Sequence, residues 1–243
     1  GRKQSCFYDQ TMSRDLARRR EIEAELRAAI QKDELSIFFQ PIVDLETGRI
    51  RTFEALVRWF HPKKGELRPD EFIPVAEETG VIITLGNWIT AQAAKAAAQW
   101  PEDVTLAVNL SPLQIKAPGA ALGVRNALRE AGLDPTRLEL EVTESLFVDD
   151  SASTESFIEE LSDLGVRFAL DDFGSGLSSF SYLKNLPIDY LKIDGSLVRA
   201  IPNEEYDRAI VSSINDVAHL MGIKTIAEFV EDDVALQCLR EMK

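Results

Sequence analysis

Seven polar side chains lie within or directly after apolar segments that have the length of β-strands. They are Glu54, Asn109, Glu141, Asp171, Asp172, Lys192 and Glu228. Carboxylate oxygens and the amide oxygen of Asn are hard ligands of the kind that bind Mg²⁺, Mn²⁺ or Ca²⁺. A zinc-type site is nearly excluded, because the chain contains only two His and two Cys. If the fold brings these side chains together, they predict a site for divalent cations.

The adjacent residues Asp171 and Asp172 favour two cations, since one carboxylate can bridge both ions while its neighbour binds the second. Two cations about 3.5–4 Å apart clamp the attacking and leaving oxygens of an in-line phosphoryl displacement. Beside such cations, Lys192 is expected to have a lowered pKa and to accept a proton from, or orient, an attacking water. Taken singly, these residues have structural explanations as helix caps or a strand-end lysine. Their number favours a shared catalytic site.

The apolar segments alternate with amphipathic segments of helical length from residue 104 onward. The expected strands are 104–108, 138–140, 166–170, 190–193 and 223–227, and the expected helices include 120–131, 153–164 and 206–221. This alternation is typical of parallel strands joined by crossover helices. Two earlier strands, 35–43 and 49–59, form a hairpin at Glu46-Thr47-Gly48. We expect an α/β fold, a modified TIM or (β/α)₈-like barrel whose last strand lies beyond Lys243, with a doubly wound open sheet as the alternative.

The first residues have helical periodicity over 13–32 and many charges. This helix either packs on the domain or arrives from an upstream domain, and we divide the chain into a linker helix at 1–32 and a barrel domain at 33–243. Further helices are expected at 70–79 and 87–100, with a polar loop over 62–69. Gly174-Ser175-Gly176 lacks P-loop spacing and is expected to form a mobile loop at the barrel mouth.

Composition excludes some classes of protein. The chain has 243 residues, and 27 Lys and Arg residues against 41 Asp and Glu residues give a net charge of −14. This balance argues against a partner of duplex nucleic acid. The sequence contains neither a membrane-spanning apolar window nor an N-terminal signal core. We interpret the chain as a piece of a longer protein, and a cytoplasmic location is expected even if the parent protein is anchored to a membrane elsewhere.

The segment Glu54-Ala55-Leu56-Val57-Arg58 resembles the motif that names the bacterial EAL domains, which are cyclic di-GMP phosphodiesterases. Further segments follow in the order typical of that family: Gln40-Pro41-Ile42, Asn109-Leu110-Ser111, Glu141-Val142-Thr143-Glu144, Asp171-Asp172-Phe173-Gly174, Lys192-Ile193-Asp194 and Glu228-Phe229-Val230-Glu231. The resemblance covers the chain from about Leu35 onward. It implies a (β/α)₈-like barrel that linearises cyclic di-GMP to 5′-pGpG with Mg²⁺ or Mn²⁺ as a pair of ions, Ca²⁺ being a non-productive substitute.

The resemblance also implies a role for each matching position. Residues that match ligands of the first cation are Glu54, Asn109, Glu141, Asp171 and Glu228. Asp171 would bridge to a second cation that Asp172 also binds, and Lys192 matches the water-activating or water-positioning lysine. Glu144 matches the glutamate that holds the loop from Asp171 to Phe180. Residues that match substrate contacts are Gln40, Leu56, Arg58, Asp172 and Glu231.

The chain departs from the family pattern at Phe229, where Gly is usual, and it lacks a later Gln-Gly motif. A positive φ at Phe229 would be costly for a residue with a side chain. Two other functions remain open, a non-catalytic cyclic di-GMP receptor and an enolase-type barrel acting on a small carboxylate. The resemblance further implies a homodimer through residues near 178–186 and an upstream GGDEF or sensory domain.

Overall fold

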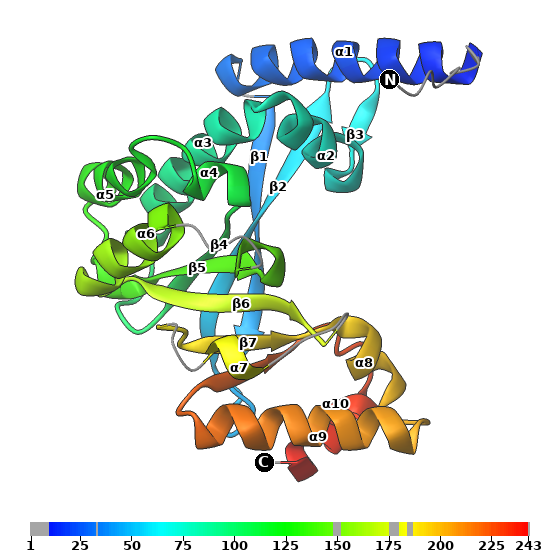
Figure 1. Ribbon diagram of the computed structural model, residues 1–243, viewed down its shortest axis with the longest axis vertical. Coiled ribbons are helices and arrows are strands. Elements are labelled where there is room, and N and C mark those ends of the chain that lie inside the picture. Colours follow the sequence, from blue (N-terminus) through cyan, green and yellow to red (C-terminus); the bar gives the residue numbers. More distant parts are fainter. Residues whose placement is uncertain (1–9, 33, 148–151, 175–179, 184–186, 243) are drawn as a thin grey trace, which may run out of the picture.

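The computed structural model describes residues 10–32, 34–147, 152–174, 180–183 and 187–242, and its centre is a curled, mostly parallel sheet (Figure 1). The strands are β1 (Leu35–Val43), β2 (Ile50–His61), β3 (Gly65–Leu67), β4 (Thr105–Asn109), β5 (Leu138–Thr143), β6 (Arg167–Phe173), β7 (Tyr190–Ile193) and β8 (Lys224–Ala227). The order is β1-β2-β4-β5-β6-β7-β8, with β3 paired to β2. β1 runs antiparallel to β2, and the strands from β2 to β8 along this path are parallel. The expected barrel-like α/β fold is confirmed.

Helices cover the outer face of the sheet (Figure 1). The longer ones are α1 (Gln10–Gln31), α2 (Pro69–Thr79), α3 (Val81–Ala97), α5 (Ala120–Ala131), α6 (Ala152–Asp163), α9 (Glu205–Leu220) and α10 (Asp233–Met242). The short helices α4 (Pro112–Ile115), α7 (Phe180–Leu183) and α8 (Gly195–Ala200) and two 3₁₀ turns, Pro135–Arg137 and Glu144–Phe147, follow strands or connect elements. Within the described ranges, no helix is both long enough and apolar enough to cross a membrane.

Two of the expected elements differ most from the structure, and the strands expected at 138–140 and 166–170 also run three residues further, to Thr143 and Phe173. The helix expected at 87–100 begins instead at Val81. Gly80, with a φ of +74°, ends α2, and the next two residues, Val81 and Ile82, are apolar and pack into the core as the first turn of α3. The polar loop expected at 62–69 contains β3, since Trp59 and Leu67 are register partners in a hairpin that doubles back on β2. An eighth barrel strand after residue 243 stays a prediction.

Alternation along the strands sends apolar side chains outward to the helices and polar ones into the barrel. On β2, Ala55, Val57 and Trp59 are buried beneath the helices, whereas Thr52 and Glu54 lie on the other face. Burying a large apolar side chain such as that of Val57 stabilises the fold by about 1.5–3 kcal/mol. Apolar burial under the helices therefore stabilises the fold, and the inner face of β2 carries the polar side chains of Thr52 and Glu54.

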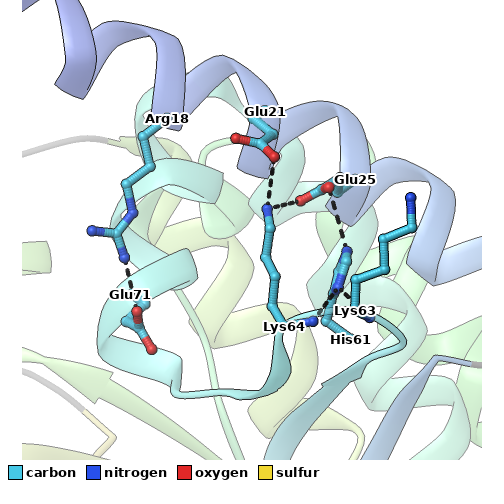
Figure 2. A network of polar contacts seen from close by, with 7 residues as sticks. All are labelled: Arg18, Glu21, Glu25, His61, Lys63, Lys64 and Glu71. Atoms are coloured by element: carbon cyan, nitrogen blue, oxygen red, sulfur yellow. Dashed lines mark hydrogen bonds and ion pairs between the residues drawn. The ribbon is translucent and has the colours of Figure 1, made fainter.

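The helix α1 lies along α2 and the β2–β3 hairpin at one end of the molecule (Figures 1 and 2). Its apolar face buries Ile22, Leu26 and Ala29, which recur at helical spacing. Around this face, Lys64 Nζ lies 3.0 Å from Glu21 Oε1 and 2.5 Å from Glu25 Oε2. Apolar burial and ion pairs together fix α1 against the end of β2.

Candidate active site

The carboxyl ends of the strands bring the predicted catalytic side chains together around one lysine. Lys192 Nζ on β7 lies 2.9 Å from Glu141 Oε2, 2.9 Å from Glu228 Oε1, 3.2 Å from Asp171 Oδ1 and 3.4 Å from Glu54 Oε2. These carboxylates come from four different segments: β2, β5, β6 and the residue that follows β8. We call Lys192 and its four carboxylates the central cluster. Sequence positions as far apart as 54 and 228 thus meet at one point.

Strand register explains this convergence. Asn109 at the end of β4 is the register partner of Glu141 on β5, and Thr143 is the partner of Asp171 on β6. Asn109 Nδ2 donates a 2.7 Å hydrogen bond to Glu54 Oε1, so the amide joins the same group. Because parallel strands carry successive inward side chains to the same edge, polar residues at their ends meet in one layer.

The central cluster holds more negative than positive charge in a buried place. The side chains of Lys192 and Glu141 are 2% and 1% exposed, and one ammonium faces four carboxylates. Burial raises the pKa of Glu141 well above its ordinary value, and Glu54 and Asp171 raise it further against the opposing effect of Lys192. Burial likewise raises the pKa of Glu228. Such an arrangement calls for additional positive charge.

The pKa of Lys192 differs from the sequence-based expectation. Burial acts to lower it, but the four carboxylates, Glu141 foremost, outweigh burial and raise it above its ordinary value. The expected lowering assumed cations beside the ammonium, whereas the protein's own groups supply only negative charge there. The direction is therefore reversed for the protein without cations, because four opposite charges lie within hydrogen-bonding distance or nearly so.

The donor set fits divalent cations of the hard class. Ligand atoms of Asp171, Asp172 and Glu228 lie within 4.8 Å of one another. Asn109 offers its carbonyl oxygen, since its Nδ2 is used by Glu54. Oxygen ligands of this kind suit Mg²⁺ or Mn²⁺. Burial and the charges of Asp171 and Asp194 raise the pKa of Asp172, as expected where carboxylates crowd without a cation.

The backbone is strained at two points of this site. Among the described residues, Asp172 (φ +56°) and Phe229 (φ +51°) are the non-glycine residues with positive φ. Each directly follows a carboxylate of the central cluster, Asp171 or Glu228. Left-handed backbone is costly for residues with a Cβ, and such strain gathers at functional sites. Phe229, which stands where the family usually has Gly, therefore does adopt the positive φ that is costly for a residue with a side chain.

The residues predicted to contact substrate near the start of the chain share a face with Glu54. Gln40 on β1 is the register partner of Glu54, and Leu56 and Arg58 follow Glu54 at intervals of two on β2. The Arg58 guanidinium lies 5.7 Å from the centre of the Phe38 ring, which is half-exposed. This face extends the central cluster along β1 and β2.

Glu231 and Glu144 lie outside the central cluster. Glu231 Oε1 accepts a 3.0 Å hydrogen bond from Arg199 on α8, whereas Glu144 is near enough to Asp172 to raise the pKa of that residue. Residues 175–179, in the loop that Glu144 is expected to hold, lie outside the described residues. So do 178, 179 and 184–186 of the expected dimer segment.

Sequence reasoning missed Glu139, Phe38 and Arg199. Glu139 is buried one layer below Glu141, where its Oε1 accepts a 2.6 Å hydrogen bond from Thr105. Burial raises the pKa of Glu139. Its spacing of two residues from Glu141 on a strand could have placed it on the inner face. For Phe38 and Arg199 no motif gave a signal.

Comparison with known proteins agrees with this architecture. The EAL domain profile matches residues 23–243. The bifunctional diguanylate cyclase/cyclic di-GMP phosphodiesterase MucR of Pseudomonas aeruginosa is 37% identical over 246 residues, covering 100% of this chain and 35% of MucR. The cyclic di-GMP phosphodiesterase NbdA of the same organism is 37% identical over 99% of this chain and 31% of its own length. The chain thus spans about a third of these curated relatives.

Solved structures show the same fold. The PaMucR phosphodiesterase in complex with c-di-GMP superposes with a TM-score of 0.86 at 38% identity, covering 91% of this chain and 92% of that one. The EAL enzyme Bd1971 in its cGMP-bound form gives a TM-score of 0.88 at 30% identity, over 95% and 65% of the two chains. The profile match, the relatives and the fold agree, and the chain belongs to the EAL domain family.

Proposed function

We propose that this domain is a divalent-cation-dependent phosphodiesterase that hydrolyses cyclic di-GMP to the linear dinucleotide 5′-pGpG by in-line attack of water. The observation that carries the proposal is the central cluster, where four carboxylates from separate segments surround one buried ammonium. Phosphodiesterase names among the relatives and the c-di-GMP complex of PaMucR support the choice of substrate.

The acidic residues would hold two cations, Mg²⁺ or Mn²⁺. The first would be bound by Glu54, Asn109, Glu141, Asp171 and Glu228, and Asp171 and Asp172 would bind the second. Cations there supply positive charge to the phosphodiester and its leaving oxygen and make water more acidic. The central cluster has four carboxylates and one ammonium, and this supports the assignment because the protein's own groups leave the negative charge unbalanced.

The chain's other residues orient the reactants. Lys192 contacts every carboxylate of the central cluster, so we assign it the holding of those groups and the positioning of the attacking water. Arg58 presents a guanidinium suited to a phosphate or a guanine edge, on the face it shares with Gln40 and Leu56. Glu144 would hold the loop that follows Asp171.

The longer relatives support a multidomain context. Because the chain spans about a third of MucR and NbdA, we propose that residues 1–32 connect the barrel, 33–243, to an upstream GGDEF or sensory domain in a cytoplasmic part of a longer protein. A homodimer is proposed on the family resemblance alone.

Chromatography of cyclic di-GMP incubated with the protein and Mn²⁺ tests the activity. We expect a single product that co-elutes with 5′-pGpG, and no conversion when EDTA replaces the cation. Binding of cyclic di-GMP without conversion would favour the receptor function instead. Calorimetry that shows no heat of binding would reject both and leave the enolase-type alternative.

A further inference from the structure

A hydrogen bond from the helical layer ends in the turn that follows Asn109. Glu77 lies on α2, and Ser111 lies between the end of β4 and the start of α4. Ser111 Oγ donates a 2.8 Å hydrogen bond to Glu77 Oε1. A carboxylate acceptor makes such a bond roughly twice as strong as a neutral acceptor does. The two residues are 34 positions apart in sequence, so tertiary packing brings them together.

The same turn is held at two further points. Leu110 N donates a 2.9 Å hydrogen bond to the backbone oxygen of Glu141 on β5. Ser111 N donates a 3.1 Å hydrogen bond to Gln114 Oε1. The Gln114 side chain is buried against Gly86 of α3, where a Cβ would lie 1.8 Å from Gln114 Nε2. The turn is therefore held from β5, α3 and α2 at once.

Capping of α4 does not explain the partner on α2. Ser111 is the N-cap residue of α4, and its Oγ accepts a 3.4 Å hydrogen bond from Leu113 N. Capping uses a lone pair of the hydroxyl oxygen and leaves the hydroxyl proton free for water. In this protein that proton goes to Glu77. The carboxylate thus restricts the turn more than the cap of a short helix requires.

Asn109 is sensitive to the position of this turn. It is the last residue of β4 and is exposed, and its Nδ2 donates to Glu54 Oε1 at 2.7 Å. The amide carbonyl oxygen is left as the proposed cation ligand. An amide oxygen has no net charge to attract a cation, so its value as a ligand depends on its placement, which must hold to within about 0.5 Å.

We propose that Glu77 and Ser111 are positioning residues for Asn109, an inference that rests on the proposed function. Their hydrogen bond holds the turn after β4 so that the Asn109 carbonyl oxygen stays available to the first cation. Neither residue contacts cation or substrate in this assignment, because Glu77 acts through Ser111 and Ser111 acts through Asn109. Loss of the hydrogen bond should therefore weaken cation binding more than it changes the reaction of the loaded site.

The first test compares Glu77→Ala with Glu78→Ala. Glu78 is the matched control, because it is the next residue of α2 and pairs with Arg19 of α1 at 2.7 Å. Calorimetric titration with Mn²⁺, without nucleotide, measures cation binding apart from activity. We expect Mn²⁺ affinity about tenfold weaker in Glu77→Ala and unchanged in Glu78→Ala. Turnover of cyclic di-GMP by Glu77→Ala should fall at limiting Mn²⁺ and recover most of its loss at saturating Mn²⁺.

Variants of the pair separate positioning from capping. Glu77→Gln keeps an oxygen acceptor, so its Mn²⁺ affinity should stay within about threefold of wild type. Ser111→Asp keeps an N-cap for α4 but sets a second carboxylate against Glu77, and we expect a loss at least as large as in Glu77→Ala. Adding Glu77→Gln to Ser111→Asp supplies an amide donor and should restore most of that affinity. If only the cap mattered, Ser111→Asp alone would bind Mn²⁺ as wild type does.

A double-mutant cycle with Asn109→Ala shows whether the pair acts through Asn109. In that background Glu77→Ala should cause little further loss of Mn²⁺ affinity, since the ligand that it positions is already absent. Wild-type affinity in Glu77→Ala, or an equal further loss in the Asn109→Ala background, would overturn the inference. Wild-type protein that binds Mn²⁺ but converts no cyclic di-GMP would instead overturn the proposed function, and the Mn²⁺ affinities of the variants would still decide the role of Glu77.

Discussion

Two lysines of this protein are each surrounded by carboxylates, and the two clusters serve different ends. Lys64 lies at the surface between Glu21 and Glu25 of α1, with its side chain 34% exposed (Figure 2). Lys192 lies inside the barrel mouth among four carboxylates, with its side chain 2% exposed. Both lysines have a raised pKa, Lys64 through its hydrogen bond to Glu25 and Lys192 through the charge of its carboxylates despite burial.

The difference lies in the balance of charge and in the access of water. At Lys64 the pKa of Glu25 is lowered, mainly by its hydrogen bond to Lys64, so the surroundings stabilise the ionised form of this carboxylate. At Lys192 the pKa values of Glu141 and Glu228 are raised by burial, so the surroundings destabilise the ionised form of these two carboxylates. A cluster that stabilises its own charges, as the one at Lys64 does, needs no charged ligand. A buried cluster whose carboxylates outnumber its ammonium is built for a ligand that brings positive charge.

Removing a carboxylate from each cluster should show the largest difference between the cation-binding cluster at Lys192 and the surface cluster at Lys64. We expect Glu54→Ala to abolish conversion of cyclic di-GMP, with a loss of at least about 10³-fold, because it removes a cation ligand. Glu21→Ala, the matched change at Lys64, should retain wild-type turnover. Initial rates by chromatography at saturating Mn²⁺ measure both, and substantial activity in Glu54→Ala would refute its role.

Removing the lysines gives the next largest contrast. Lys192→Met should lower kcat by about 10²–10⁴-fold while cyclic di-GMP still binds, since the side chain orients the reaction rather than the nucleotide. Lys64→Met should leave kcat unchanged. Calorimetric binding measured with Ca²⁺ in place of Mn²⁺ keeps the nucleotide intact during the titration. Equal loss of binding and turnover in Lys192→Met would contradict the orienting role.

Cations should stabilise the protein through the central cluster alone. At about 100 times the dissociation constant, a cation adds about 2.7 kcal/mol to the free energy of unfolding, or about 5–10 °C in Tm. Thermal unfolding with and without Mn²⁺ should show this shift in wild type and in Glu25→Gln. The shift should be small in Glu228→Gln, and an undiminished shift there would remove Glu228 from the cation site.

The parts of the site that follow from local pattern were predictable from sequence. Short apolar runs identify the strands, and a polar residue at the end of a parallel strand lies at the shared edge whatever the rest of the fold does. For this reason Glu141 and Asp171 meet Lys192 as expected. The bounds of α5 also agree, because its hydrophobic periodicity is strong and Gly132 ends it.

The parts that depend on tertiary neighbours were not predictable. Nothing near Arg199 in sequence indicates that it stacks on Phe229, thirty residues away, and pairs with Glu231. The direction of the Lys192 pKa depends on how many carboxylates face it at once, a quantity that no single strand contains. Short β3 escapes prediction because its pairing with β2, not its own composition, makes it a strand.

The smallest effect is expected at α1, where the charges of Glu25 and Lys64 help to dock the helix. Because the pKa of Glu25 is lowered, its contribution is full above the ordinary value of 4.5 and is lost as pH falls through the lowered value. Because the pKa of Lys64 is raised, its contribution is full below 10.5 and is lost at higher pH. Glu25→Gln should therefore speed hydrogen exchange in α1 at pH 7 by a few-fold, within about 1 kcal/mol, and match wild type in acid. Glu23→Gln is the matched control, because it loses an ion pair with Arg27 inside the same helix. It should not alter the acid dependence of exchange. If it alters that dependence as Glu25→Gln does, the charges of Glu25 and Lys64 do not control the docking of α1.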